Sequence, residues 1–127
     1  RTFRGWVSVR FAFREPTLAG EKSYVHITVE NTGTPQDRMQ VLNALSGAFS
    51  ADVLGSPIEN WSTSNAGAVL SPQESMNVDS QKALDIMKTV CARAKMTYAL
   101  VELSEDPSNV TVKVTVKFTY SDLVESA

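Results

Sequence analysis

Apolar and polar side chains alternate strictly from Asn109 to Tyr120. One side of an extended backbone here would carry Val110, Val112, Val114, Val116, Phe118 and Tyr120, and the other Thr111, Lys113, Thr115, Lys117 and Thr119. Successive side chains of a strand point to opposite faces, so the pattern predicts a strand with one buried and one exposed face. The apolar side is β-branched or aromatic, which suits a pleated, half-covered surface.

Three other stretches predict strands. The same alternation runs from Arg4 to Arg14 and from Ser23 to Glu30, and Thr97 to Leu103 is also predicted to be a strand. Pro and Gly in residues 15–20 predict a hairpin connection between the first two strands. Residues 104–108 predict a turn into the last strand, so the chain is expected to form two antiparallel hairpins.

Apolar residues at helical spacing predict a first helix that ends between Phe49 and Leu54. Thr34 can cap this helix, Pro35 suits its first position, and Asp37 places negative charge in its first turn. The apolar stripe consists of Val41, Leu42, Leu45, Ala48 and Phe49. This stripe would lie on the sheet.

A second helix is predicted near residues 71–95. Ser71 to Glu74 match a capping box, so either one bent helix runs from there to Lys95, or the chain breaks near Asn77 and Asp79 caps a new helix. The apolar stripe consists of Ala83, Leu84, Met87, Val90, Cys91 and Ala94. Residues 55–70, rich in Ser, Asn and Gly around Trp61, are predicted to be a long loop.

The expected order is hairpin, helix, long loop, helix, hairpin. An antiparallel β-sheet of about four strands with two helices packed on one face buries every apolar stripe at once. We therefore predict the α+β class and a two-layer sandwich. The 127 residues are expected to form a single domain, 1–127.

Charge and targeting features narrow the class of protein. A formal net charge of −2 predicts no strong field that would attract nucleic acid or an anionic membrane. No apolar run is long enough to span a bilayer as a helix, and no secretory signal pattern opens the sequence. We expect a cytoplasmic or virion-associated protein that is not secreted.

The residue types do not predict an enzyme. With one cysteine and one histidine, a nucleophilic pair would have to be Cys91 with His26, and their positions favour an inert core thiol and a surface imidazole. Metal-ligand clusters and phosphate-binding loops are absent from the sequence. We predict no metal, no cofactor and no small-molecule substrate, and a small hydrolase using Cys91 and His26 is the least favoured alternative.

The exposed faces of the first and last strands carry a candidate RNA-binding surface. If these strands are neighbours, the surface comprises Arg10, Arg14, Lys113, Lys117, Trp6 and Tyr24. A basic sheet face with aromatic side chains is one way in which proteins hold single-stranded RNA. The competing interpretation is that these cations keep an exposed sheet soluble.

Self-assembly is the other interpretation. A four-stranded sheet with helices on one face leaves two edges and one face uncovered. Trp6 on that face and Trp61 in the loop are large apolar groups of the kind enriched at interfaces. Pairing of edges or faces would cover them, so we expect a homo-oligomer, a dimer or larger.

The segment from Tyr24 to Ala66 resembles part of a known family. Its strand Tyr24–Glu30, polar turn and helix through Ala44–Phe49 are similar to the strand-then-helix ending of small RNA-phage coat proteins. Those proteins carry helices on an antiparallel sheet, dimerise, and bind an RNA hairpin on the exposed face. This chain departs from them by continuing with a helix and a hairpin, and no residue role is carried over. Viral matrix proteins contain a loosely similar strand–helix run.

These observations rank three hypotheses. The first is a non-enzymatic structural or self-assembly protein, coat- or matrix-like, that acts through its exposed sheet face and edges. The second is an RNA-binding module that uses the basic face. The third is the small hydrolase.

Overall fold

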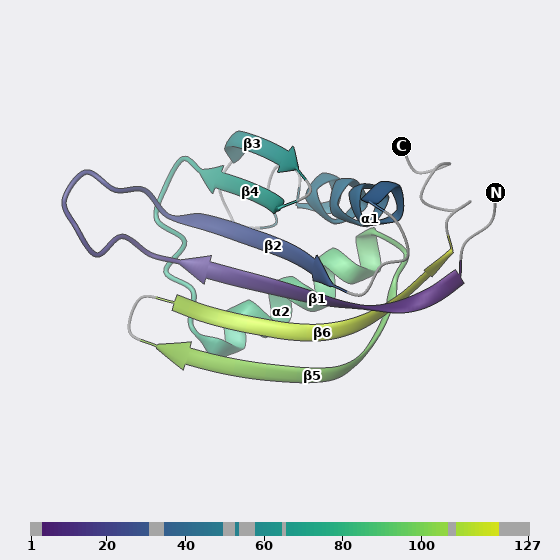
Figure 1. Cartoon of the computed structure of the whole chain (residues 1–127). Coiled ribbons are helices and arrows are strands. Elements are labelled where there is room, and N and C mark those ends of the chain that lie inside the picture. The colour runs from purple at the N-terminus through teal and green to yellow at the C-terminus, as the bar shows by residue number, and fades with distance from the viewer. Residues whose placement is uncertain are drawn as a thin grey trace.

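A computed structural model describes residues 4–30, 35–49, 53, 58–64, 66–106 and 109–119. The elements in order are β1 (Arg4–Arg14), β2 (Tyr24–Glu30), α1 (Pro35–Ala48), β3 (Ile58–Ser64), β4 (Gly67–Pro72), α2 (Ser80–Arg93), β5 (Thr97–Asp106) and β6 (Asn109–Thr119). They form an antiparallel sheet and two helices (Figure 1), which confirms the predicted α+β class.

The sheet has six strands in the order β3-β4-β2-β1-β6-β5, and each neighbouring pair is antiparallel. The prediction of about four strands is therefore wrong in number. The interior strands β1 and β6 pair along their whole length, from Arg4 opposite Thr119 to Arg14 opposite Asn109. The outer strands are β3 and β5, and the first and last strands are neighbours, which is the condition that the predicted basic surface requires.

The two extra strands come from the region that the sequence predicts to be a loop. Residues 55–70 contain much of the β3–β4 hairpin, in which Trp61 pairs with Leu70 and Thr63 with Ala68. Asn and Gly are depleted in strands, so the local sequence does not predict this hairpin. Tertiary packing determines it, because Gly67 has a φ of +131° and a Cβ there would lie 2.6 Å from the Ile27 carbonyl oxygen.

The alternation in β1, β2 and β6 predicts the buried faces of their described side chains correctly, and the predicted burial of Phe118 and Tyr120 lies outside that description. The apolar side chains of these strands form one cluster with residues of both helices. Its strand members include Val7, Val9, Phe11, Phe13, Val25, Ile27, Val29, Val110, Val112, Val114 and Val116. We name this side of the sheet the core face and the opposite side the outer face.

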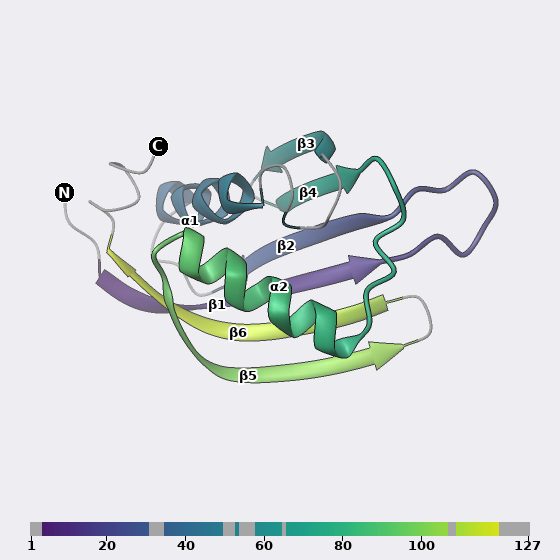
Figure 2. The same ribbon diagram turned by 180° about the vertical axis from the view of Figure 1, so that it is seen from behind.

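Both helices contact the sheet. Helix α1 packs against β2, β3 and β4, and α2 packs against β5 and β6. In Figure 2, α2 lies across the sheet, with α1 near the β3–β4 end. The ring centroids of Phe11 and Phe49 are 6.1 Å apart, which joins β1 to the end of α1. The predicted α1 stripe is buried, while its predicted cap, Thr34, lies outside the described residues.

The start of α2 resolves the alternative left open by the sequence. Asp79 caps the helix, and its carboxylate accepts a hydrogen bond from the Lys82 backbone N–H at 2.8 Å. Ser71 and Pro72 instead end β4, so the capping-box prediction for residues 71–74 is wrong. Ser71 and Pro72, the first two residues of the capping-box motif, are paired with β3 and therefore cannot begin a helix.

Candidate interaction surfaces

The six residues of the predicted basic surface lie on the outer face in three cross-strand pairs. Register places Trp6 opposite Lys117, Arg10 opposite Lys113, and Arg14 opposite Tyr24. Directly opposed residues of an antiparallel pair extend from the same face. The pairs follow one another along β1 at four-residue steps, about 13 Å apart for an extended strand.

Two cations face each other at the centre of this surface. Arg10 is exposed and Lys113 half-buried, and directly opposed like charges destabilise a sheet. On its other side Lys113 is opposite Glu102 of β5, which offsets part of the repulsion. Within the described part of the chain, no ion pair is formed by Arg10. The centre of the outer face therefore retains positive charge that an anion could neutralise.

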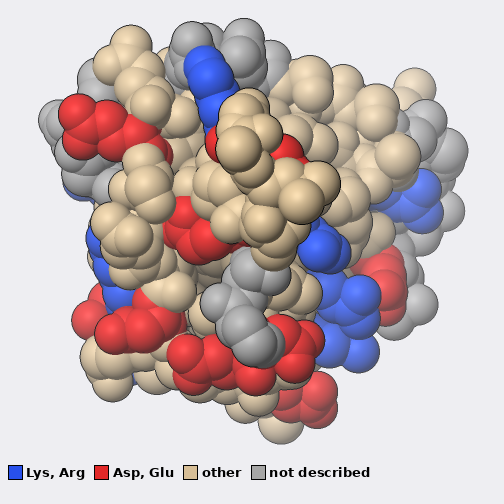
Figure 3. Space-filling view, turned by 90° about the vertical axis from the view of Figure 1, so that its left-hand side faces the viewer, with Lys and Arg blue, Asp and Glu red and all other residues tan. Residues whose placement is uncertain are grey.

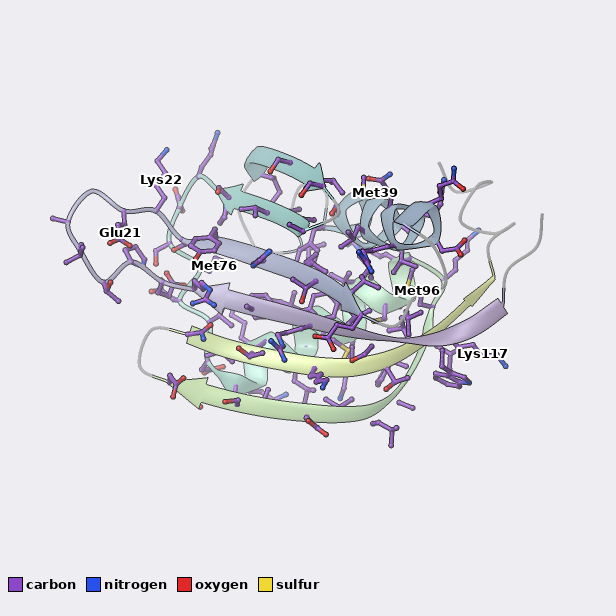
Figure 4. The ribbon with its side chains drawn as sticks, in the orientation of Figure 1. Glu21, Lys22, Met39, Met76, Met96 and Lys117 are labelled. Carbon is purple, nitrogen blue, oxygen red and sulfur yellow. The ribbon has the colours of Figure 1, made fainter. Side chains whose placement is uncertain are left out.

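Trp6 is in contact with a cation of its own sheet. The Nζ atom of Lys117 lies 5.9 Å from the centroid of the Trp6 ring, an attraction worth about 0.5–1 kcal/mol at an exposed site. The Trp6 side chain is still 49% exposed. Lys117 lies at the end of the sheet where β1 begins (Figure 4). This contact holds the indole in place while leaving much of it open to a partner.

The third pair is more enclosed. Arg14 and Tyr24 are half-buried, and Asn109 lies opposite Arg14 on the other side. The Oδ1 atom of Asn109 is buried and accepts no hydrogen bond from the described residues. Glu15 follows directly and accepts hydrogen bonds from the hydroxyls of Ser23 and Ser75. These bonds tie both ends of the β1–β2 connection to the segment before α2.

The outer strand β5 exposes a line of large apolar side chains that sequence reasoning did not single out. They are Tyr98, Leu100, Val101 and Leu103, of which Leu100 is 79% exposed and Leu103 45% exposed. Tyr98 is paired with Val116 and Leu103 with Val112, so both extend from the core face. Helix α2 covers them only in part. This line, named the β5 edge, is an apolar surface beside the edge of β5 that is not paired with β6.

A β-bulge interrupts this strand. Between Ala99, opposite Thr115, and Glu102, opposite Lys113, β5 has one more residue than β6. Leu100 has a φ of +52°, a left-handed conformation in which a bulky side chain is an outlier. The bulge shifts the alternation, which is why Tyr98 and Leu103, five positions apart, share a face. The adjacent apolar pair Leu100 and Val101 is the sequence signal that could have revealed it.

Charge on the molecule is divided between regions. Acidic side chains gather along the lower part of the end view in Figure 3, the side on which β5 lies in Figure 1, and basic side chains gather to its right. The exposed carboxylates of β5 are Glu102, Glu105 and Asp106. Glu105 accepts a hydrogen bond from the Ser80 hydroxyl, which joins the end of β5 to the start of α2.

The second predicted interface residue, Trp61, lies in the outer strand β3 and not in a loop. Its side chain is outside the described part of the structure. The structure thus separates the two tryptophans in the sheet: Trp6 is in the central strand β1, and Trp61 is in an edge strand.

The structure does not bring Cys91 and His26 together. Cys91 is buried on α2 among the core residues, whereas His26 alternates with the buried Val25 and Ile27 and extends from the outer face. Burial raises the pKa of the Cys91 thiol to about 12, so the nucleophilic thiolate is disfavoured. The Cys91 Sγ atom instead lies 3.9 Å from the Met87 Sδ atom. This geometry offers no nucleophile and base within reach of each other.

Two further searches concern the described residues alone. Among them, no group of three or more His, Cys, Asp or Glu side chains is arranged to hold a metal ion. None of the described helices is long and apolar enough to cross a membrane.

Comparison with known proteins adds no family to this description. Neither the protein-family models nor the curated proteins searched include a match to the chain.

Proposed function

We propose that this protein is a non-enzymatic structural protein that assembles with copies of itself through its sheet edges and outer face. In this proposal the chain is a single two-layer sandwich whose helix-free face and free edges meet other copies. A coat- or matrix-like role in a cytoplasmic or virion-associated assembly fits such a protein. It needs no cofactor and no substrate.

The β5 edge is the observation that supports assembly most directly. An outer strand presents unpaired backbone N–H and C=O groups, and natural proteins protect such edges with lysine or other charged residues, proline, a bulge or a short strand. β5 has a bulge, and its carboxylates lie only at position 102 and beyond. β5 is ten residues long and contains neither lysine nor proline. Its exposed apolar side chains would lose contact with water if a partner covered them.

The test of assembly is the native mass in solution. Sedimentation equilibrium across a wide range of protein concentration is expected to show an oligomer that dissociates reversibly on dilution. Leu103→Lys places a charge in the exposed apolar line and should shift the equilibrium toward the monomer. Leu18→Lys is the control, because Leu18 is also exposed but lies in the β1–β2 connection. A monomer at every concentration would contradict the proposal.

RNA binding is a second candidate function, favoured by the opposed cations Arg10 and Lys113. Such a pair weakens the sheet unless an anion lies between or above the two charges. A single-stranded RNA could place phosphates near the cations and a base against the exposed part of Trp6. The acidic β5 bounds this candidate surface on one side, so the surface consists of residues of β1 and β6 with Tyr24 of β2.

Titration of a fluorescent single-stranded RNA with the protein tests this candidate. Arg10→Thr is expected to weaken binding and to reduce the slope of log affinity against log salt by about 0.7, the loss of one phosphate contact. The same change should leave the melting temperature equal or higher, because the like-charge pair is relieved. Arg93→Thr, an equal change of charge on α2, is the control. Equal loss of affinity in both variants would rule out a defined site.

A further inference from the structure

The edge of β5 is suited to one particular partner strand. Its exposed side chains include apolar residues on both sides of a bulge, and its carboxylates lie only at position 102 and beyond. Lys95, also exposed, precedes the strand. The two halves of this edge therefore differ in charge, and an antiparallel partner of the same sequence would place unlike halves together.

The bulge restricts the register of such a pair. Before the bulge, even-numbered residues such as Tyr98 extend from the core face; after it, odd-numbered residues such as Leu103 do so. Opposed residues in an antiparallel pair share a face. In a pair of β5 strands, opposed residues can share a face on both sides of the bulge only if the two-fold axis passes between two consecutive residues. An axis that passes through a single residue would set core-face residues opposite outer-face residues beyond the bulge.

We propose that two copies of the chain pair antiparallel through β5, with the two-fold axis between Leu100 and Val101. This inference rests on the proposed self-assembly and names its surface and register. Tyr98 is then opposite Leu103 of the second copy, and Leu100 is opposite Val101 of the second copy. The exposed apolar line of each copy covers that of the other, and the two six-stranded sheets become continuous.

The same register pairs the charges. Asp106 falls near Lys95 of the second copy, which precedes β5 in a turn, and Ala99 is opposite Glu102 of the second copy. No carboxylate faces another carboxylate directly. The second copy has the same bulge at the same position, so its alternation shifts where that of the first copy does. Opposed side chains therefore share a face on both sides of the bulge. These features favour a second copy of this chain as the occupant of the edge.

Disulfide trapping tests the register. The double variant Thr97→Cys/Ser104→Cys places cysteines that oppose each other across the axis, and mild oxidation is expected to yield a covalent dimer. Thr97→Cys/Glu105→Cys is one residue out of phase and should cross-link poorly. The native Cys91 is buried and does not interfere. Cross-linking of the second variant but not the first would overturn the register.

Exchange of two charges, and replacement of the apolar Leu100 by a polar residue, test the β5 surface in an otherwise native chain. Lys95→Glu and Asp106→Lys should each weaken the dimer about 3- to 10-fold, and the two together should restore it. Lys88→Glu on α2 is the control of equal charge change. Leu100→Asn should weaken the dimer at least about tenfold without lowering the melting temperature of the monomer, since asparagine tolerates the left-handed conformation.

The outcomes separate this inference from the function on which it rests. A wild-type chain that stays monomeric overturns both. An oligomer that neither cross-links through the 97–104 variant nor responds to Leu100→Asn overturns the β5 pairing and leaves assembly through another surface. Cross-linking, weakening and charge rescue together support the pairing as stated.

Discussion

Cys91 shows how one buried side chain can exclude a chemistry. Its thiol is covered by core residues of α2 and lies against Met87, and burial raises its pKa to about 12 from an ordinary value of 9.0. A thiolate is the reactive form, so the folded protein keeps this cysteine unreactive near neutral pH. The histidine that would have activated it lies on the opposite face of the sheet.

We predict that Cys91 reacts with a thiol reagent only as fast as the protein opens. Labelling at neutral pH should be slow in buffer and should become rapid in denaturant, because unfolding removes the burial that suppresses the thiolate. Free cysteine sets the reference rate. Fast labelling of the folded protein would restore the hydrolase hypothesis.

The same shift of pKa predicts a dependence of stability on pH. Above pH 9.0 the unfolded thiol loses its proton while the folded thiol keeps it until about pH 12. The folded state then binds more protons, so this contribution is present below pH 9.0 and is lost as the pH rises toward about 12. The free energy of unfolding should fall more steeply over this range in the wild type than in Cys91→Ala. Parallel curves for the two proteins would contradict the assignment.

At the scale of elements, two glycines illustrate opposite demands. Gly47 is in the last turn of α1, is exposed, and has open space where a Cβ would lie. Gly67 begins β4 with positive φ, and a Cβ there would meet the Ile27 carbonyl oxygen and the His26 Nε2 atom, at 2.6 and 2.8 Å. One glycine is a weakness of its helix, and the other is required by the approach of β4 to β2.

We predict that Gly47→Ala and Gly67→Ala change stability in opposite directions. Gly47→Ala should raise the free energy of unfolding by about 0.5–1 kcal/mol, since alanine fits a helix and restricts the unfolded chain. Gly67→Ala should lower it by about 1–3 kcal/mol through backbone strain and overlap. Chemical denaturation of both variants measures the two changes. A stabilised Gly67→Ala would show that β4 does not lie this close to β2.

The elements that the sequence predicts well are those whose local pattern agrees with their final environment. β1, β2 and β6 alternate because each has one face in the core, and the stripes of α1 and α2 repeat at helical spacing for the same reason. β3 and β4 could not be predicted this way. Their residues have weak strand propensity, and pairing with β2 and the fit of Gly67 against Ile27 determine their conformation.

The candidate surfaces divide in the same way. Alternation predicts from sequence that Arg10 and Lys113 extend away from the core, but the pairing of β1 with β6 and the register that sets these two residues opposite each other come from the structure. The β5 edge could not be foreseen as a whole. The sequence predicts the strand but not that it would be outermost, nor that Leu100 would adopt a left-handed conformation.

For the whole molecule, the strand ladder implies unequal local stability. β1 and β6 are interior strands that pair along their full length, whereas the β3–β4 hairpin joins β2 only over residues 25–27 and 68–70. Regions with few shared hydrogen bonds and free edges open with less free energy than the centre of a sheet. The hairpin is therefore expected to open separately from the centre.

We predict that amide hydrogen exchange is slowest in β1 and β6 and faster in β3. Amides of β5 should exchange quickly in dilute protein and slow down as concentration rises, because assembly would occupy the outward edge. Mass spectrometry of exchanged peptides measures each strand separately. If the protein assembles but exchange in β5 does not depend on concentration, the assembly surface is the β3 edge or the outer face and not β5.

The pairing of β1 with β6 also has a consequence for the order of events during synthesis. β1 leaves the ribosome first among the six strands, yet one of its two neighbours follows about a hundred residues later. Until β6 is made, β1 lacks one of its two partner strands. The valines and phenylalanines of β1 could then associate with other nascent chains. Because Arg4 lies opposite Thr119, a circularly permuted gene that joins these two strands and opens residues 16–22 would place β1 after β6. β1 would then be synthesised last, when both of its neighbours, β2 and β6, have already been made, and this protein should aggregate less during synthesis.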